Sequence, residues 1–335
     1  MPRGAGTPLL DRKRRTTMKI NKACELFLDY CRTAKNLSAH THRAYQIDLA
    51  DFLAYAGPHK DLAEIDKLTI RAFLGHLMEE RGLKPATAKR RLACLKVMFG
   101  WLEDEELIDQ NPMYRLKARV TLPKELPQAL SREEMRRLFV YWRTRLDLPP
   151  SAPLRQRHFE VLKRHPDFTA FTGYLGLELL FATGVRVSEL VAITLEDVDV
   201  ANGVIVIHGK GNRERRVFLT DDALKYLIAV YAERPERLGT GATPLLVNTR
   251  GVPASAQFIR KLLHEAGRGA GLSRPVTPHM VRHTTATLLL EEGVDIRFVQ
   301  ALLGHHSIAT TERYTQVSDR QLQELLETKH PRRRI

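Results

Sequence analysis

The sequence predicts a mainly α-helical protein with a small β-hairpin or sheet, divided into two domains. Its 335 residues exceed the usual length of one compact domain, and 43% apolar residues are enough for a core in each of two. Apolar residues recur at helical spacing along most of the chain. A single pair of strand-like runs, joined by a glycine-containing turn, interrupts this pattern.

The first domain is predicted to be a helical bundle at 18–113, preceded by a flexible basic tail at 1–17. Met18, directly after this tail, is a candidate alternative start of translation. Ser38 offers an N-cap, and Tyr45 falls on an apolar helix face, so we expect it in the core. Turn signals separate the helical segments, which we expect at 21–34, 38–56, 67–81 and 85–107.

The fourth of these segments carries five cations and no acid between positions 84 and 96. A solvated helix face would normally mix both signs of charge. The pattern therefore favours a helix that faces DNA over a plain surface. The candidate DNA contacts are Lys84, Lys89, Arg90, Arg91 and Lys96.

A basic, proline-containing linker is predicted at 114–130, and the second domain at 131–335. Ser131 and Glu134 form a capping box that opens a helix. Residues rich in Pro, Arg and His at 145–167 indicate a surface loop with a short helix. The remaining predicted elements are a helix at 170–184, hairpin strands at 203–208 and 215–219, and a helix at 278–291 that begins with Thr277 and Pro278.

The charge of the chain indicates a polyanionic partner. Fifty-three Lys and Arg against 39 Asp and Glu give +14, which suits nucleic acid and also suits an anionic membrane surface. No apolar run approaches the roughly 18 residues of a membrane helix, and the start lacks a signal-peptide core, so we expect a cytoplasmic protein. Three cysteines fit no metal-ligand spacing, so we expect reduced thiols, no metal and no disulfide at Cys24, Cys31 and Cys94.

Candidate catalytic residues gather in the second domain. His279 and Arg282 lie three apart on one helix face, near an N-terminus that favours phosphate. A lone pair of this kind is common by chance and is usually a surface pair. The pair becomes more significant because other residues suited to reaction at a phosphate accompany it. These residues are Arg186, Glu189, Lys210, His305 and Tyr314.

The order and approximate spacing of these seven residues resemble the active-site set of the tyrosine recombinase (phage integrase) family. The resemblance covers about residues 20–332. The pattern Leu37-Ser-x-x-Thr41-x-x-x-Tyr45-x-x-Asp48-Leu is similar to the family's core-binding domain, and the ending His330-Pro-Arg332 is similar to Xer-type recombinases. The sequence departs from the family pattern in two places. The segment at 145–167 is longer than a minimal Xer-like catalytic domain needs, and the tail at 1–17 is too short for the arm-binding domain of larger phage integrases.

The resemblance implies a two-domain, C-shaped DNA clamp, made of a SAM-like core-binding domain and an α+β catalytic domain. It implies a homotetramer, or a heterotetramer with a second recombinase, on duplex DNA recombination sites. The end of the chain would then pack against a neighbouring protomer through Leu322, Leu325 and Leu326. A membrane partner and a cofactor are not expected.

The resemblance also implies a role for each site residue. Tyr314 attacks a phosphodiester to form a 3′-phosphotyrosyl bond, His279 is the first candidate base, and Lys210 protonates the departing 5′ oxygen. The remaining roles are phosphate binding by Arg186, Arg282 and His305 and positioning of a cation by Glu189. Apart from the resemblance, two roles are open to the hairpin arginines, DNA-backbone contact or a solvated face; these residues are Arg213, Arg215 and Arg216.

Two other functions compete with this interpretation. A type IB topoisomerase uses similar Arg, Lys, His and Tyr chemistry, although the Xer-like helical domain speaks against it. A non-catalytic DNA-binding regulator is the second alternative, although the complete catalytic set speaks against it. The sequence leaves open the DNA target, because base readout depends on docking geometry. It also leaves open the choice between dimer resolution, integration or excision of a mobile element, and inversion.

Overall fold

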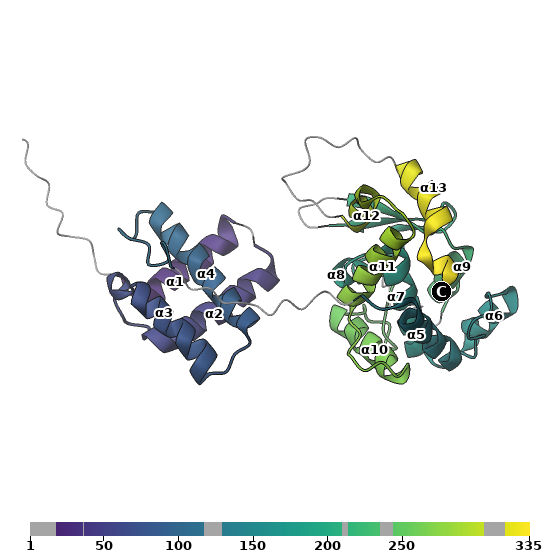
Figure 1. The fold of residues 1–335 in the computed structure, drawn as a ribbon, viewed down its shortest axis with the longest axis horizontal. Helices are drawn as coiled ribbons and strands as arrows, with labels where there is room; N and C mark the ends of the chain where they lie inside the picture. Colours follow the sequence, from purple (N-terminus) through teal and green to yellow (C-terminus); the bar gives the residue numbers. More distant parts are fainter. Residues whose placement is uncertain (1–17, 36, 117–128, 210–213, 235–243, 305–318) are drawn as a thin grey trace, which may run out of the picture. The chain divides into compact units, whose positions relative to one another are not determined.

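The computed structural model describes residues 18–35, 37–116, 129–209, 214–234, 244–304 and 319–335. The chain divides into two compact units, residues 1–124 and 125–335 (Figure 1). The division falls inside the stretch at 114–130 that the sequence indicates as a linker. The tail at 1–17, and Lys210, Arg213, His305 and Tyr314, lie outside the described residues.

Unit 1 is helical, and its four predicted helical segments are confirmed. The Ser38 hydroxyl caps α2 by accepting from the backbone N–H of Thr41 at 3.3 Å, and the Asp66 carboxylate caps α3 through Thr69 at 2.8 Å. The elements are α1 (Ile20–Thr33), α2 (Ala39–Ala56), the 3-10 turn η1 (Leu62–Glu64), α3 (Lys67–Gly75), the π-helical turn η2 (His76–Glu80) and α4 (Pro85–Asp104).

Aromatic side chains and cysteines fill the core of unit 1. Tyr45 is partly buried and stacks on Phe27 with 5.8 Å between ring centroids, which confirms its predicted core position. The three cysteines are buried, as the sequence indicates. Burial raises the pKa of the Cys24 thiol to about 12, so this thiol is unreactive at neutral pH.

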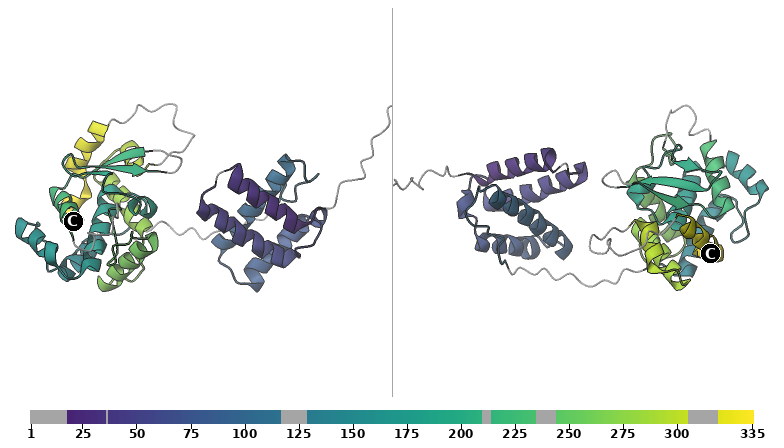
Figure 2. Two further views of the ribbon diagram at one scale, coloured as in Figure 1. Left: turned by 180° about the vertical axis from the view of Figure 1, so that it is seen from behind. Right: turned by 90° about the horizontal axis from the view of Figure 1, so that it is seen from above.

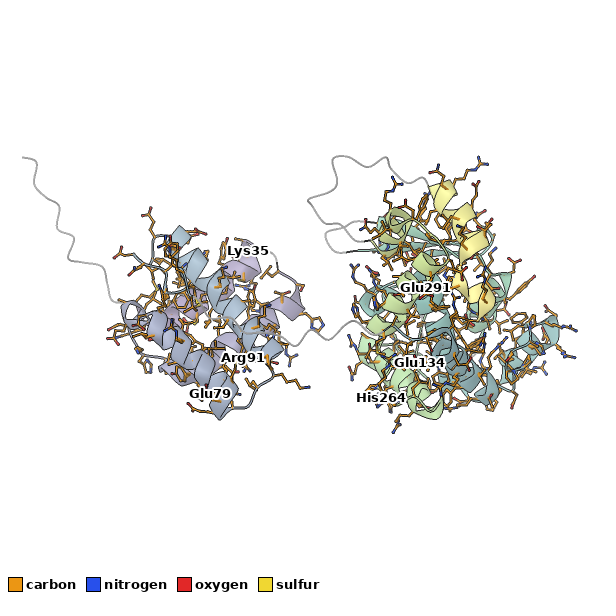
Figure 3. The ribbon with its side chains drawn as sticks, in the orientation of Figure 1. Lys35, Glu79, Arg91, Glu134, His264 and Glu291 are labelled. Carbon is orange, nitrogen blue, oxygen red and sulfur yellow. The ribbon has the colours of Figure 1, made fainter. Side chains whose placement is uncertain are left out.

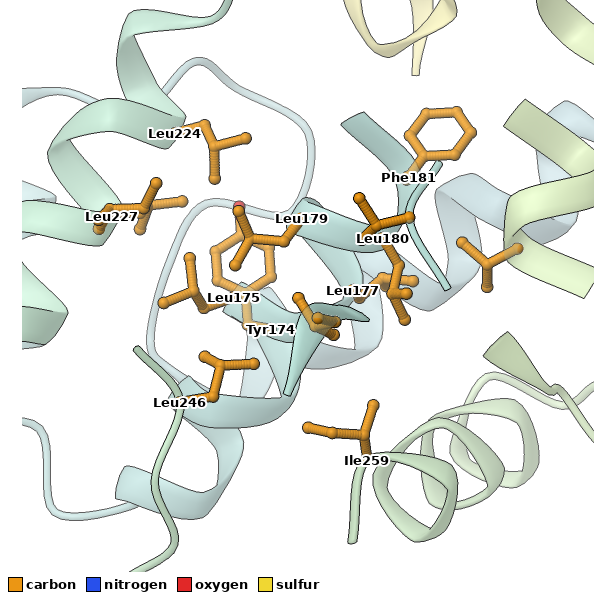
Figure 4. Close-up of a cluster of buried hydrophobic side chains, with 14 of the residues drawn as sticks. Tyr174, Leu175, Leu177, Leu179, Leu180, Phe181, Leu224, Leu227, Leu246 and Ile259 are labelled. Carbon is orange, nitrogen blue, oxygen red and sulfur yellow. The ribbon is translucent and has the colours of Figure 1, made fainter. Parts of the chain in front are cut away.

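Unit 2 is built around α7 (Phe168–Thr183), a helix that is buried on nearly all sides. Figure 4 shows apolar side chains of α7 meeting those of α9 (Asp222–Ala232) and α10 (Ala256–Gly269). The other helices before the C-terminal segment are α5 (Arg132–Arg145), α6 (Gln156–Arg164), α8 (Val187–Leu190), α11 (Pro278–Glu291) and α12 (Ile296–Leu303).

The sheet of unit 2 has the order β1-β2-β3 and is antiparallel. Its hairpin of β2 (Val204–His208) and β3 (Glu214–Phe218) confirms the predicted strands, and its register ends with His208 opposite Glu214. The additional strand β1 (Val198–Asp199) was not predicted. Two residues are too short a run to show strand periodicity.

The C-terminal segment packs on its own unit, through α13 (Asp319–Lys329) and the 3-10 turn η3 (Pro331–Arg334). Figure 2 shows α13 beside the sheet. Leu322 and Leu326 are only 5% and 1% exposed within this core, and Leu325 packs against it. This apolar helix face is therefore buried within the chain, and contact of these leucines with a neighbouring protomer stays a prediction.

In the described part of the chain, no helix combines the length and apolar character needed to cross a membrane.

Candidate active site

The candidate site lies where α7 and α12 end, beside α8 and α11. Both helices end in a glycine with left-handed backbone, Gly184 with φ of 62° and Gly304 with φ of 64°. A Cβ atom on Gly184 would stand 2.8 Å from a methyl group of Leu303. A Cβ atom on Gly304 would stand 3.2 Å from the guanidinium of Arg215. Both positions thus require glycine for its backbone and for its small size.

Arg282 joins the two helix ends. Its guanidinium donates to the carbonyl oxygen of Gly184 at 2.6 Å and to that of Leu303 at 2.7 Å. A cation at helix C-termini is favoured by the partial negative charge of the terminal carbonyls. The side chain of Thr285, one turn along α11, donates to the carbonyl of Phe181 at 3.0 Å and ties α11 to α7. Arg282 is therefore a fixed, buried cation.

Glu189 joins two further arginines. Its carboxylate accepts from the backbone N–H and from the guanidinium of Arg186, both at 2.8 Å. It also accepts from both terminal nitrogens of Arg215, at 2.8 and 3.2 Å. Arg215 in turn donates to the carbonyl of Leu302 at 3.3 Å. Glu189 is 8% exposed, whereas the side chain of Arg186 is 47% exposed.

The charges of this cluster favour an anionic ligand. Three guanidinium groups surround one carboxylate, which leaves a net charge of plus two. Burial alone would raise the pKa of Glu189, but hydrogen bonds from Arg215 and Arg186 outweigh burial and lower that pKa to about 2. Burial and the charge of Arg186 lower the pKa of Arg282 to about 10. Glu189 and Arg282 are thus both charged at neutral pH.

His279 is exposed on the first turn of α11, and Arg282 is buried one turn later. Thr277 caps this helix by accepting from the backbone N–H of Met280 at 3.2 Å, and Pro278 occupies its first turn, as the sequence predicts. The structure thus brings together Arg186, Glu189 and Arg282.

Arg215 differs from its expected role. The sequence placed it among the DNA-backbone contacts of the hairpin, but its side chain is only 17% exposed and is held by Glu189. The physical reason is the buried carboxylate, which needs a second cation once it leaves water. Sequence reasoning also missed Gly184 and Gly304. Their position directly after an apolar helical run was the available signal.

The predicted DNA-contact cations of α4 divide into two groups. Lys84, Lys89, Arg90 and Lys96 are exposed. Arg91, labelled in Figure 3, is 7% exposed and forms a close ion pair with Asp51 of α2. Its burial and this ion pair favour a structural role over the predicted DNA contact.

The carboxylates responsible for this difference come from α2. Asp48 is 1% exposed and lies against Arg90 and, at 3.6 Å, Arg91. Burial raises the pKa of Asp48, although both arginines oppose the shift. Counting charge along α4 alone could not reveal acids from another helix.

Among the described residues, no group of three His, Cys, Asp or Glu side chains could hold a metal ion.

Comparisons with known proteins identify the family of this chain. The model of the phage integrase family matches residues 154–321, and the model of the phage integrase N-terminal SAM-like domain matches residues 24–106. Tyrosine recombinase XerC of Pelotomaculum thermopropionicum is 35% identical, over 91% of this chain and 97% of its own. Tyrosine recombinase XerD of Oceanobacillus iheyensis is 31% identical, over 93% and 99%.

A solved structure shares the fold. It is a lambda integrase tetramer bound to a Holliday junction, with a TM-score of 0.64 and 18% identity over 91% of this chain and 81% of that one. The chain belongs to the phage integrase family, whose members are tyrosine recombinases, enzymes that break and rejoin DNA strands. Within that family its curated relatives include the Xer recombinases XerC and XerD.

Proposed function

We propose that Arg186 and Arg282 hold the phosphate at which a DNA strand is cut, and that Tyr314 is the nucleophile. The observation that carries this proposal is the cluster of three guanidinium groups around one carboxylate, with its net charge of plus two. Each guanidinium can donate to two phosphate oxygens at once. The two carbonyl bonds of Arg282 use two of its five N–H groups.

In the proposed reaction the Tyr314 oxygen forms a bond to phosphorus as the bond from phosphorus to the 5′ oxygen breaks. The phenol proton passes to His279, and Lys210 gives its proton to the 5′ oxygen. The phosphate gathers a second negative charge in the transition state, so guanidinium donors stabilise this state more than the ground state. His305 holds a phosphate oxygen in this scheme.

Glu189 is a positioning residue in this proposal. It holds Arg186 through two hydrogen bonds, one from the backbone N–H and one from the guanidinium, and it also binds a second cation, Arg215. A fixed guanidinium loses less conformational freedom when it binds phosphate, so its orientation contributes to the rate.

Rejoining reverses these steps. A 5′-hydroxyl attacks phosphorus and releases Tyr314, and strand exchange results when that hydroxyl belongs to a second duplex. The phosphotyrosyl bond conserves the energy of the broken linkage, so the proposal includes no nucleotide cofactor and no metal.

We further propose that the chain acts on duplex DNA recombination sites as a tetramer of identical subunits or with a second recombinase. The lambda integrase that shares its fold is a tetramer on a Holliday junction, which supports this assembly. A DNA substrate favours a cytoplasmic location. The similarity to XerC and XerD favours dimer resolution over integration and excision of a mobile element.

A suicide-substrate assay tests the proposal. Duplexes from the gene's own neighbourhood, nicked so that the cut strand diffuses away, are incubated with wild type, Tyr314→Phe and Tyr226→Phe. Tyr226 is a matched control, because it is 55% exposed on α9, away from the site. We expect a denaturation-resistant adduct with wild type and Tyr226→Phe alone.

The same assay separates the alternatives. An adduct with Tyr314→Phe would exclude Tyr314 as the nucleophile. Tight binding with no adduct from any protein would support a non-catalytic regulator. Relaxation of supercoils without joining of a second duplex would support a topoisomerase.

A further inference from the structure

His208 stands at the open end of the β2-β3 hairpin and joins two carboxylates. Its Nε2 atom lies 2.9 Å from an oxygen of Asp197, and its Nδ1 atom lies 3.2 Å from an oxygen of Glu214. His208 and Glu214 are register partners and form the last pair of the hairpin before residues 209–213. Lys210 is two residues further along the sequence.

Asp197 is a fixed anchor for this contact. Its other carboxylate oxygen accepts from the backbone N–H of Thr194 at 2.7 Å and from the Thr194 hydroxyl at 2.8 Å. Its backbone carbonyl accepts from Val206 of β2 at 2.9 Å. The side chain of Asp197 is only 12% exposed, whereas that of His208 is 53% exposed. The imidazole therefore links the hairpin end to a rigid part of unit 2.

The chemistry of imidazole decides when this link is complete. A neutral ring donates from one nitrogen and accepts at the other, so it can satisfy only one of the two carboxylates. An imidazolium donates from both nitrogens and can bind Asp197 and Glu214 together. Both ring nitrogens face a carboxylate here, and this arrangement suits the charged form.

We propose that His208 is a positioning residue, which holds the ends of β2 and β3 together through Asp197 and Glu214 and so increases the rate at which Lys210 protonates the departing 5′ oxygen. This inference rests on the proposed general-acid role of Lys210. Neither the catalytic arginines nor Glu189 takes part in the link.

The link depends on pH. The hydrogen bond and charge of Asp197, with a further contribution from Glu214, raise the pKa of His208 above its ordinary 6.5. A raised folded-state pKa means that the link is complete below about pH 6.5. It weakens as the pH rises through the raised value.

Two DNA substrates distinguish the loss of a positioned general acid from a general loss of cleavage activity. One carries the natural 5′ oxygen at the cut, and the other carries sulfur at that bridging position. A thiolate is a far better leaving group, with a pKa near 8.5 for an ordinary thiol, so the bond from phosphorus to sulfur breaks without a donated proton. Loss of a positioned acid therefore slows cleavage of the oxygen substrate alone.

The variants are His208→Ala, His208→Arg and Lys210→Ala, with His264→Ala as a control on an exposed histidine of α10 (Figure 3). At pH 6 we expect His208→Ala to slow cleavage of the oxygen substrate by about tenfold, less than the 10² to 10⁴ of a lost general acid. Cleavage of the sulfur substrate should stay unchanged. His208→Arg should restore the rate, because a guanidinium binds both carboxylates at every pH.

The ratio of wild-type to His208→Ala rates should fall towards one between pH 6 and pH 8.5. Equal slowing of both substrates by His208→Ala, or no slowing, would overturn the positioning role. Lys210→Ala tests the premise separately. If Lys210→Ala slows both substrates equally, the general-acid assignment of Lys210 fails; if only His208→Ala departs from expectation, that assignment stands and the inference fails.

Discussion

Arg332, near the end of the chain, donates two hydrogen bonds of 2.7 Å to Glu178 in the middle of α7. Glu178 is 1% exposed, and the Arg332 guanidinium also lies 4.8 Å from the ring centroid of Phe139. A bidentate pair of this kind fixes the C-terminal segment against the helix that leads to Gly184. The anchorage of this segment and the geometry of the site therefore depend on the same helix.

Removing this guanidinium should destabilise unit 2. Arg332→Met leaves the Glu178 carboxylate buried without its partner, so we expect a loss of about 3–5 kcal/mol in the free energy of unfolding. The chain has two tryptophans, Trp101 in unit 1 and Trp142 in unit 2, so a Trp101→Phe background lets fluorescence follow urea unfolding of unit 2. Arg334→Ala is the control, with a 70% exposed side chain and an expected loss within about 1 kcal/mol. Equal losses for both variants would refute the special role of Arg332.

Replacement of Arg215 distinguishes a site residue from a DNA contact. Arg215→Lys keeps the charge but cannot reproduce the two-pronged hydrogen bonding to Glu189, so we expect cleavage to fall at least about tenfold. DNA affinity and its salt dependence should change little. Arg216→Gln, on the exposed side of the same strand, is the control. A drop of about 0.9 in the salt slope of binding for Arg215→Gln would indicate that Arg215 binds a phosphate directly.

The cations of α4 should likewise divide into DNA contacts and structural residues. Lys89→Gln with Lys96→Gln should weaken DNA binding and lower the salt slope by about 0.9 for each phosphate that the helix no longer neutralises. Arg91→Met should leave the slope unchanged and destabilise unit 1 by about 3 kcal/mol, because Asp48 and Asp51 are deprived of a buried partner. Trp101 fluorescence in a Trp142→Phe background measures that change. A normal stability for Arg91→Met would contradict the buried network.

Gly184 should be sensitive for two reasons, its left-handed backbone and its close approach to Leu303. Gly184→Ala costs about 1 kcal/mol for the backbone and also displaces the Leu303 side chain, so cleavage should fall as the carbonyl held by Arg282 moves. Gly82→Ala is the matched control, with φ of 58° and no atom within 4 Å of an added Cβ. It should show the backbone cost alone. Equal effects of the two substitutions would mean that the approach to Leu303 is unimportant.

The depressed pKa of Glu189 predicts sensitivity to acid. A carboxyl whose folded-state pKa lies below its unfolded value contributes stability above pH 4.5, and this contribution is lost as the pH falls from 4.5 towards 2. Urea unfolding of unit 2 at pH 6, 4 and 3 should show a shallower loss for Glu189→Gln than for wild type. Glu291→Gln, with a 55% exposed side chain, should match wild type. Parallel curves for wild type and Glu189→Gln would contradict the shift.

The sequence predicted features that depend on neighbouring residues more successfully than contacts between residues far apart in the chain. Helices with caps, such as α2 at Ser38, and the hairpin of β2 and β3 depend on nearby residues and were confirmed. The spacing of three residues between Arg186 and Glu189 likewise indicated that these two side chains could pair. The roles of the catalytic residues remain predictions.

The contacts that Arg91, Arg215 and Leu326 make within the chain were not predicted, for one physical reason. Their partners lie far along the chain: Arg91 meets Asp51, Arg215 meets Glu189, and Leu326 joins the core of its own unit. A helix or strand shows which of its faces is charged or apolar, but not what covers that face. Only the folded chain supplies that information.

The oxygens that hold Arg282 belong to the main chain. No exchange of a neighbouring side chain can delete these acceptors, provided that α7 and α12 keep their paths. Laboratory evolution towards new target sites could therefore randomise the exposed positions of α12 broadly while this arginine keeps its anchorage. Gly184 and Gly304 are the exceptions, since a side chain at either of these left-handed positions would alter the path itself.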